Sequence, residues 1–263
     1  MRLAFDSVTG QREKAERLRA LHRGPPILVL PNAWDAASAR VFAAHPRCRA
    51  IGTASAAIAP SLGYEDHERT PRELMLEAVG RIARAVELPV TADLEAGYGD
   101  SAGTAEGAIG AGAVGLNLED STHEPDEPLA PIGEQADKIA AVREVGARLG
   151  VPLVINARVD VYLTEVGEPG ERLTLTATRA RAYREAGADC IFVVGVRDAG
   201  TIGALVREID APLNVLGGSG APPVPELERL GVARVSVGPG PFRATLRLLE
   251  QVGRDLFEQG AYP

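Results

Sequence analysis

Cysteine is scarce in this chain of 263 residues, which contains only Cys48 and Cys190. Two thiols cannot build a disulfide scaffold or a cysteine-rich metal site, so we expect both to be small buried residues. No apolar run approaches the roughly 20 residues that a bilayer requires. The first twenty residues are too polar for a signal peptide. We therefore expect a cytoplasmic protein that makes no contact with membranes.

Basic residues are outnumbered, with 28 Lys and Arg against 36 Asp and Glu and a net charge of −8. Nucleic-acid binding needs clustered Lys and Arg, so we expect no nucleic-acid partner. Hydrophobic residues make up 45% of the chain and charged residues 24%. These are the proportions of an ordinary globular protein, which excludes the disordered and fibrous classes.

Short apolar runs rich in β-branched residues recur along the chain, and a helical pattern follows each one. The runs are continuous rather than alternating, which is typical of parallel strands buried on both faces. Eight such units in about 250 residues favour a closed (β/α)₈ TIM barrel over an open doubly wound sheet. The predicted strands cover residues 27–30, 50–53, 89–92, 114–118, 152–156, 190–194, 212–216 and 232–237.

The stretches between the runs place apolar residues at steps of three and four, as amphipathic helices do. An extra helix over residues 11–22 is predicted ahead of the first strand. No linker or low-complexity tract interrupts the chain, so residues 1–263 are predicted to form a single barrel domain. Residues 241–263 are predicted to form an apolar C-terminal helix and tail. This segment either packs on its own barrel or docks onto another subunit.

Acidic side chains collect where the predicted strands end, which is where barrel enzymes carry their active sites. Asp93 and Glu95 follow the third run, Glu119 ends the fourth, and Asp66 lies in the loop after the second. Clustered carboxylates raise one another's pKa unless a cation compensates them. Oxygen ligands without a His or Cys cluster select Mg²⁺ or Mn²⁺ over Zn²⁺. The sequence therefore predicts a Mg²⁺ (or Mn²⁺) site formed by Asp93, Glu95 and Glu119.

Two further features stand at the same ends of the strands. Arg158 follows the fifth run, where it could pair with the acids, bind a substrate carboxylate or stabilise an oxyanion. The glycine-rich turns 217–220 and 238–240 lie where many barrels hold a phosphate. Glycine turns at strand ends are common, so this second signal is weak.

Five ordered segments carry a family resemblance: LPNAWD (30–35), SAAIAPSLGYED (55–66), VTADLEAGYGD (90–100), GLNLED (115–120) and NARVD (156–160). With them the sequence resembles the isocitrate lyase/phosphoenolpyruvate mutase superfamily from residue 30 to about residue 243, and looks like a phosphonomutase-type member. The resemblance implies a (β/α)₈ barrel, Mg²⁺ and a small 2-oxo acid bound through its carboxylate and keto oxygens. It also implies a last helix exchanged between the subunits of a dimer or tetramer.

The resemblance also assigns roles by position. Asp93, Glu95 and Glu119 match the metal-binding acids, some acting through water, and Asp66 matches the aspartate of a gating loop. Arg158 matches an arginine that stabilises the substrate. The predicted catalytic residues are thus Arg158, Asp66 and His123, and the predicted substrate-binding residues are Trp34, Thr53, Ala54, Ser55, Asp93, Arg158 and Asn214.

Two departures from the family pattern limit the reaction. Glu95 stands where Asp is usual. The loop Ser121–Pro128 reads STHEPDEP, without the Cys-Gly-His and Lys that the resembled lyases carry and without the mutase lysine. We therefore expect neither isocitrate lyase, methylisocitrate lyase nor phosphoenolpyruvate mutase activity. His123 is the candidate proton carrier in this loop.

The first functional hypothesis is a Mg²⁺-dependent C–C lyase or decarboxylase acting on a small 2-oxo (di)carboxylic acid through a metal-stabilised enolate. Decarboxylation needs no positioned acid at its first step, so it suits a site without the acid loop. The alternatives are a C–C or P–C hydrolase or phosphomutase-like enzyme, and a barrel that binds 2-oxoglutarate-type acids without turnover. A fourth possibility is an unrelated phosphate-binding barrel that uses the glycine turns.

Overall fold

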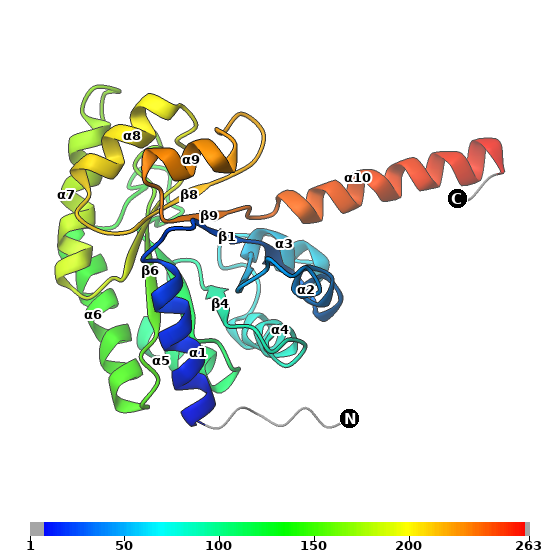
Figure 1. Ribbon diagram of the computed structural model, residues 1–263, viewed down its shortest axis with the longest axis horizontal. Coiled ribbons are helices and arrows are strands. Elements are labelled where there is room, and N and C mark those ends of the chain that lie inside the picture. Colours follow the sequence, from blue (N-terminus) through cyan, green and yellow to red (C-terminus); the bar gives the residue numbers. More distant parts are fainter. Residues whose placement is uncertain (1–7, 261–263) are drawn as a thin grey trace.

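In the computed structural model, which describes residues 8–260, nine parallel strands form one sheet that curls into a nearly closed barrel (Figure 1). The strands are β1 (Leu28–Leu30), β2 (Asn32–Ala33), β3 (Ile51–Thr53), β4 (Val90–Asp93), β5 (Gly115–Glu119), β6 (Val154–Val159), β7 (Cys190–Val193), β8 (Leu213–Leu216) and β9 (Arg234–Ser236). The helices are α1 (Val8–Leu21), α2 (Ala36–Ala43), α3 (Ser55–Ser61), α4 (Arg72–Ala83), α5 (Ser101–Gly110), α6 (Ile132–Arg148), α7 (Arg172–Glu185), α8 (Ala199–Glu208), α9 (Val224–Leu230) and α10 (Gly240–Arg254), which continues as a π-helical segment, Asp255–Gln259.

The predicted TIM barrel is confirmed, with its first strand split in two. β1 pairs with β9 and β2 pairs with β3, so these two short strands form the two edges of the sheet, which meet where the barrel closes. Pro31 lies between them and has no N–H to donate to the ladder, which accounts for the break. Its carbonyl still accepts a hydrogen bond from Gly52 N at 2.9 Å. Eight strand positions therefore arise from nine strands.

The Asn32 side chain joins the strands on either side of this break. Its Oδ1 accepts hydrogen bonds from Val237 N and Gly238 N, both at 2.9 Å, and its Nδ2 donates to Thr53 O at 2.7 Å. Asn32 is almost completely buried, and a buried amide is stabilising only when such partners are present. This residue therefore closes the barrel at the rim that carries the predicted site.

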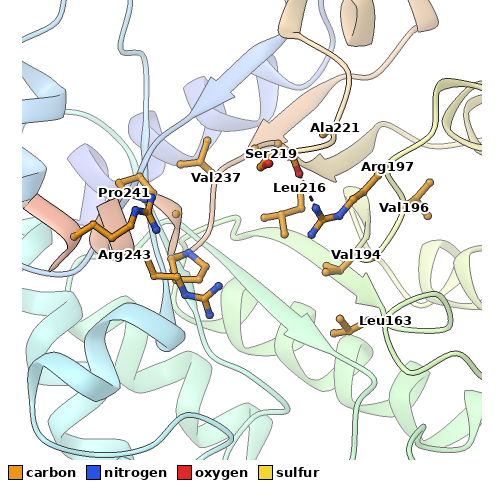
Figure 2. Close-up of a pocket in the computed structure, with 16 residues that line it drawn as sticks. Leu163, Val194, Val196, Arg197, Leu216, Ser219, Ala221, Val237, Pro241 and Arg243 are labelled. Carbon is orange, nitrogen blue, oxygen red and sulfur yellow. Dashed lines mark hydrogen bonds between the residues drawn. The ribbon is translucent and has the colours of Figure 1, made fainter. Parts of the chain in front are cut away.

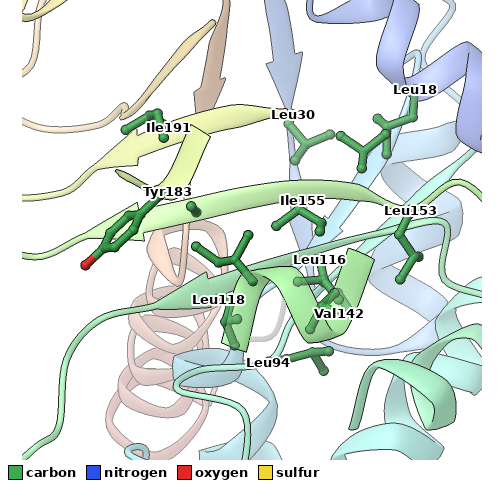
Figure 3. Packing of buried hydrophobic residues seen from close by; sticks show 14 of the residues in the cluster. Leu18, Leu30, Leu94, Leu116, Leu118, Val142, Leu153, Ile155, Tyr183 and Ile191 are labelled. Carbon is green, nitrogen blue, oxygen red and sulfur yellow. The ribbon is translucent and has the colours of Figure 1, made fainter. Parts of the chain in front are cut away.

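The core lies between the strands and the surrounding helices (Figure 3). All five residues of β5 are buried, as the continuous apolar run predicts for a strand covered on both sides. Ile139 and Val142 of α6 belong to the same cluster of buried residues as Leu116 and Ile155 of the neighbouring strands. Burial of one such side chain contributes roughly 1.5–3 kcal/mol, so the helices and the barrel depend on each other for stability.

The extra N-terminal helix is also confirmed, since α1 matches the predicted residues 11–22 closely. Leu18 is fully buried, and its Cδ2 would lie 2.9 Å from a Cβ placed on Gly115, the first residue of β5. Arg19 Nε donates to Asp189 Oδ1 at 2.8 Å, just before β7. These contacts fix α1 across the end of the barrel at which the strands begin.

His22 follows α1 and gives the fold a dependence on pH. It is almost completely buried, and its Nδ1 lies 2.8 Å from Leu18 O. Burial, reinforced by the charge of Arg234, lowers the pKa of His22 from 6.5 to about 4. Below pH 6.5 the unfolded chain therefore takes up a proton that the folded chain excludes, and stability falls until about pH 4.

We expect this single proton to remove about 3 kcal/mol of the free energy of unfolding between pH 6.5 and pH 4. The His22→Gln variant lacks the titrating group, so its unfolding free energy is expected to fall less steeply over that interval. Urea unfolding of both proteins at several pH values measures the difference. Parallel curves for the two proteins would show that folding does not lower the pKa of His22.

Helix α10 extends away from the barrel (Figure 1) and has no buried residue. Its apolar side chains are exposed, with Leu248 at 62% and Phe257 of the π-helical segment at 87%. In this structure, α10 touches its own barrel at its base, where Phe242 contacts Trp34, and buries no residue along its length. Exchange between subunits stays a prediction, and residues 261–263 of the predicted tail lie outside the described residues. Within residues 8–260, no helix is long and apolar enough to span a bilayer.

Candidate active site

Asp93, the last residue of β4, is held in place by three neighbouring elements. Its Oδ2 accepts hydrogen bonds from Ser55 N at 3.0 Å and Ser55 Oγ at 3.1 Å, at the start of α3. Its Oδ1 accepts a hydrogen bond from Asn117 Nδ2 at 3.3 Å, and its own N–H donates to Thr53 Oγ1 at 2.8 Å. No Lys, Arg or His of the described chain forms an ion pair with it. Of the predicted substrate-binding residues Thr53, Ala54 and Ser55, Ser55 thus holds the Asp93 carboxylate and Thr53 accepts a hydrogen bond from its backbone.

Glu95 lies two residues further along, almost completely buried. Its Oε1 accepts a hydrogen bond from Tyr98 Oη and its Oε2 accepts one from Glu68 N, both at 2.6 Å. Burial raises the pKa of Glu95 to about 7, and the nearby charges of Asp66 and Asp93 act in the same direction. Asp66 Oδ1 is itself buried without a hydrogen-bond partner among residues 8–260. Glu95 therefore lies within electrostatic range of two further acids, and none of the three forms an ion pair with a basic side chain of residues 8–260.

Glu119 and Arg158 form a buried ion pair from the neighbouring strands β5 and β6. Arg158 Nη1 contacts Glu119 Oε2. The Arg158 fork is bidentate on Asp160, with Nε donating to Oδ1 at 2.7 Å and Nη2 to Oδ2 at 2.8 Å. Burial alone would lower the pKa of Arg158, but the charges of Glu119 and Asp160 raise it instead. The guanidinium is therefore a permanent cation in a fixed orientation, with two of its five N–H groups left for a ligand.

His123 joins this group from the loop after β5. Its Nε2 lies 3.1 Å from Glu119 Oε1, and its Nδ1 lies 2.9 Å from His67 Nδ1. The contact with Glu119 raises the pKa of His123. The Ser121–Leu129 bridge closes the base of the loop, so His123 belongs to the site rather than to an exposed loop tip.

The loops of the site also contain most of the unusual backbone. Among residues 8–260, six residues other than glycine have positive φ, and five of them lie in these loops: His67, Glu68, Glu95, Tyr98 and His123. The left-handed region costs a side-chain-bearing residue roughly 1–2 kcal/mol. Such strain persists where surrounding contacts impose it, which occurs most often at functional sites.

Two predicted substrate-binding residues lie apart from the acids. Trp34 packs edge-on against Phe242 at the base of α10, with ring centroids 5.4 Å apart. Asn214 is fully buried in the barrel, and its Nδ2 donates to Ser236 Oγ at 3.2 Å. Within residues 8–260, neither side chain contacts Asp93, Glu95, Glu119 or Arg158.

Sequence reasoning missed two residues that shape the site. Tyr98 and Glu68 bind the two oxygens of Glu95, and Glu68 Oε1 also accepts a hydrogen bond from Tyr98 N at 2.6 Å. Tyr98 could have been found from its position three residues after Glu95 in the ADLEAGYGD segment. Nothing in the sequence marks Glu68, because its contact depends on the path of a loop.

The donor set fits a hard divalent cation held partly through water. No group of three or more His, Cys, Asp or Glu side chains within residues 8–260 forms a ready metal cage. Mg²⁺ does not require one, because it keeps several waters and binds through one or two carboxylates. Asp93 has no cationic partner, the pKa of Glu95 is raised, and Asp66 Oδ1 is unpaired. An added positive charge would relieve all three conditions.

Comparison with known proteins gives a consistent result. The profile of the phosphoenolpyruvate phosphomutase family matches residues 18–257. An uncharacterised protein of Mycobacterium tuberculosis H37Rv is 36% identical over 229 residues, 86% of this chain and 82% of its own. An oxaloacetate decarboxylase of Rhodopseudomonas palustris BisB18 is 31% identical (79% and 72%). A 2-methylisocitrate lyase of Escherichia coli K12 is 30% identical (77% and 70%).

Solved structures resemble the chain over nearly its whole length. A candidate phosphonomutase from Burkholderia cenocepacia J2315 is 43% identical with a TM-score of 0.87, covering 92% of this chain and 99% of its own. A phosphonopyruvate hydrolase in complex with oxalate and Mg²⁺ is 23% identical with a TM-score of 0.84, covering 94% and 88%. The second similarity shows the shared fold.

Proposed function

The chain belongs to the phosphoenolpyruvate phosphomutase family of the isocitrate lyase/phosphoenolpyruvate mutase superfamily, and from that membership we propose that it is a Mg²⁺-dependent decarboxylase. Its substrate would be a small 2-oxo dicarboxylic acid of the oxaloacetate type. The superfamily includes lyases and decarboxylases. The observation that carries the proposal is that nearby strands bring to one rim a cation in a fixed orientation, Arg158, and a carboxylate without an ion-pair partner, Asp93.

The residues of the chain divide the work as follows. Asp93, Glu95 and Glu119 would hold Mg²⁺, some of them through water. When bound, Mg²⁺ supplies Lewis-acid stabilisation for charge that develops on the keto oxygen. Arg158 presents its two remaining N–H groups to an oxygen of the substrate, in an orientation that Asp160 fixes. A preorganised donor of this kind contributes several kcal/mol to transition-state stabilisation.

The loop after β5 favours decarboxylation over retro-aldol cleavage. Retro-aldol chemistry needs a base for the hydroxyl and an acid for the leaving carbanion. Of the residues in Ser121–Pro128, His123 alone contacts the acidic cluster in the described chain. Loss of CO₂ requires no acid at its first step, and His123 remains available to protonate the product at carbon.

Hydrolytic C–C cleavage is a second candidate, favoured by the contact between His123 and Glu119. A histidine oriented by a carboxylate is a common arrangement for activating water. Both reactions can begin from oxaloacetate, but their products differ, because decarboxylation yields CO₂ and pyruvate whereas hydrolysis yields oxalate and acetate. One incubation therefore separates the two candidates.

We expect the protein to convert oxaloacetate to equal amounts of CO₂ and pyruvate when Mg²⁺ is present, and to lose this activity when EDTA removes the metal. Since Mg²⁺ alone promotes some decarboxylation, the rate is compared with Mg²⁺ in the absence of protein and with the Asp93→Ala variant. Formation of oxalate would assign the hydrolase instead. A rate equal to both controls would exclude catalysis and leave a barrel that binds 2-oxo acids, which Mg²⁺-dependent binding of oxalate would test.

A further inference from the structure

The interior of the barrel contains a layer of polar side chains next to the candidate active site. Their neighbours in sequence belong to the apolar core between the strands and the helices, and side chains alternate along a strand, so these residues point into the barrel. In most TIM barrels such positions are filled by Val, Ile and Leu. Here they are occupied by buried polar residues: Asn117 of β5, Asn156 of β6, Asn214 of β8, and Arg234 and Ser236 of β9.

Arg234 crosses this interior toward the acids. Its Nε donates to Ser236 Oγ at 3.1 Å and its Nη2 donates to Asn117 Oδ1 at 3.4 Å. Because β9 and β5 are not neighbours in the sheet, the contact with Asn117 passes through the barrel. Asn117 Oδ1 also accepts a hydrogen bond from Asn156 Nδ2 at 2.7 Å, and Asn117 Nδ2 donates to Asp93 Oδ1 at 3.3 Å. One side chain therefore separates the Arg234 guanidinium from the Asp93 carboxylate.

The charge of Arg234 has no direct partner. Within residues 8–260, no Asp or Glu forms an ion pair with it and its Nη1 has no hydrogen-bond partner. Burial lowers the pKa of Arg234 to about 10, against the opposing effects of Cys190 and Asp93, so the guanidinium is still charged at neutral pH. Burial also raises the pKa of the Cys190 thiol to about 12, which keeps that group neutral. Of these two groups, Asp93 is therefore the one whose negative charge compensates Arg234.

Three arginines at the same rim differ from Arg234 in their contact with water. Arg197, Arg243 and Arg247 line a pocket of about 520 Å³ at the carboxyl ends of β7 to β9, and Figure 2 shows the first two on opposite sides of it. All three are exposed, so water solvates and screens their charges. Arg234 does not line this pocket and is completely buried. Its charge therefore acts on the acids through the low-dielectric interior, where electrostatic effects are stronger.

We propose that Arg234 is a buried counter-charge that sets the affinity of the metal site, compensating Asp93 across Asn117 in the absence of metal and weakening the binding of the divalent cation. In the metal-free protein, this charge offsets the mutual repulsion of the acids. When a divalent cation is bound, the same charge repels it and favours its release. The inference rests on the Mg²⁺ site proposed above and not on the reaction.

The Arg234→Met variant is expected to bind Mn²⁺ roughly tenfold more tightly than the wild type, because one positive charge is removed from the interior next to the site. A purely structural role predicts the opposite sign, since a disturbed Asp93 would bind the ion less tightly. Mn²⁺ alone is titrated into the full chain, and electron paramagnetic resonance measures the free ion without substrate or turnover. Arg234→Gln, which also lacks the charge but keeps a hydrogen-bonding group, is expected to show the same tightening and replaces Arg234→Met if that variant does not fold.

Matched variants separate charge from shape. Arg234→Lys keeps the positive charge without the planar fork of arginine and is expected to bind Mn²⁺ as the wild type does. Arg229→Met removes an exposed charge from the last turn of α9 and is expected to leave the affinity unchanged. Asp93→Ala is expected to lose the binding, which locates the ion at the site. Thermal denaturation checks that each variant folds.

The possible results distinguish a failure of this inference from a failure of the metal site. If Asp93→Ala loses Mn²⁺ binding but Arg234→Met binds the ion no more tightly than the wild type, the role of Arg234 is overturned and the metal site stands. Equal tightening in Arg234→Lys and Arg234→Met would also overturn it, because the effect would come from shape. If the wild type binds no Mn²⁺, or Asp93→Ala binds it equally well, the metal site and this inference are overturned together.

Discussion

The Arg158→Lys variant is expected to lose roughly 10²–10³-fold in kcat/KM for the 2-oxo acid, the usual cost of one oriented charge-stabilising donor. Lysine keeps the positive charge, but it cannot span both oxygens of Asp160 while also contacting Glu119. An arginine at a bidentate site is therefore not replaceable by lysine. Steady-state kinetics with oxaloacetate and Mg²⁺ give the measurement.

Arg148→Lys is the matched control, since Arg148 forms an exposed ion pair with Glu106 on the outer helices. Its kcat/KM is expected to equal that of the wild type. If Arg158→Lys instead loses stability and retains full activity, Arg158 serves only to neutralise the buried acids Glu119 and Asp160. Thermal denaturation of both variants alongside the kinetics separates these two roles.

The largest loss of stability is expected when Arg179 of α7 is replaced, because this residue pairs with the buried Asp120. Its Nη1 donates to Asp120 Oδ2 at 3.1 Å and contacts Tyr183 Oη at 2.9 Å. Asp120 is fully buried, and its Oδ1 accepts a hydrogen bond from Asp160 N at 2.9 Å. Arg179→Met leaves the Asp120 charge buried and unpaired, so we expect the free energy of unfolding to fall by about 3–5 kcal/mol.

Arg181→Met provides the comparison, because Arg181 lies two residues away on α7 and is exposed. Its unfolding free energy in urea is expected to stay within about 0.5 kcal/mol of the wild type, as for most surface substitutions. Adding Asp120→Asn to Arg179→Met removes the unpaired charge and is expected to recover part of the loss. Equal losses in Arg179→Met and Arg181→Met would indicate a change in α7 itself rather than in the buried network.

The barrel was predictable because its strands are marked by continuous apolar runs. Each predicted run overlaps an observed strand, and β5 differs from the predicted residues 114–118 by one position at each end. Pro31 can be read from the sequence, but the division of the first strand into β1 and β2 could not be predicted. It depends on the pairing of β1 with β9 and of β2 with β3. Helix α5 was harder to predict, because its SAGTAEGAIG sequence carries small residues rather than an apolar stripe. Its packing on its neighbours determines that it is a helix.

The candidate site was predictable where it depends on strand ends and not where it depends on loops. Asp93 and Glu119 end their strands and Arg158 is the last residue but one of the next strand, so the parallel sheet brings all three to one rim. Glu68 lies in a loop and has a positive φ, a backbone conformation that no sequence pattern predicted. The metal-binding and catalytic roles of these residues stay predictions until the proposed variants are measured.

The opposite charges on the two halves of the rim affect how a ligand approaches. Acids surround the ends of β4 and β5, while Arg197, Arg243 and Arg247 surround the ends of β7 to β9. An anion diffusing toward a negatively charged protein is repelled over most of its surface and attracted at the arginines. Molecules carrying charge at one end would thus arrive already oriented, and dissolved salt, which shortens the reach of these fields to about 8 Å at physiological ionic strength, would slow their capture.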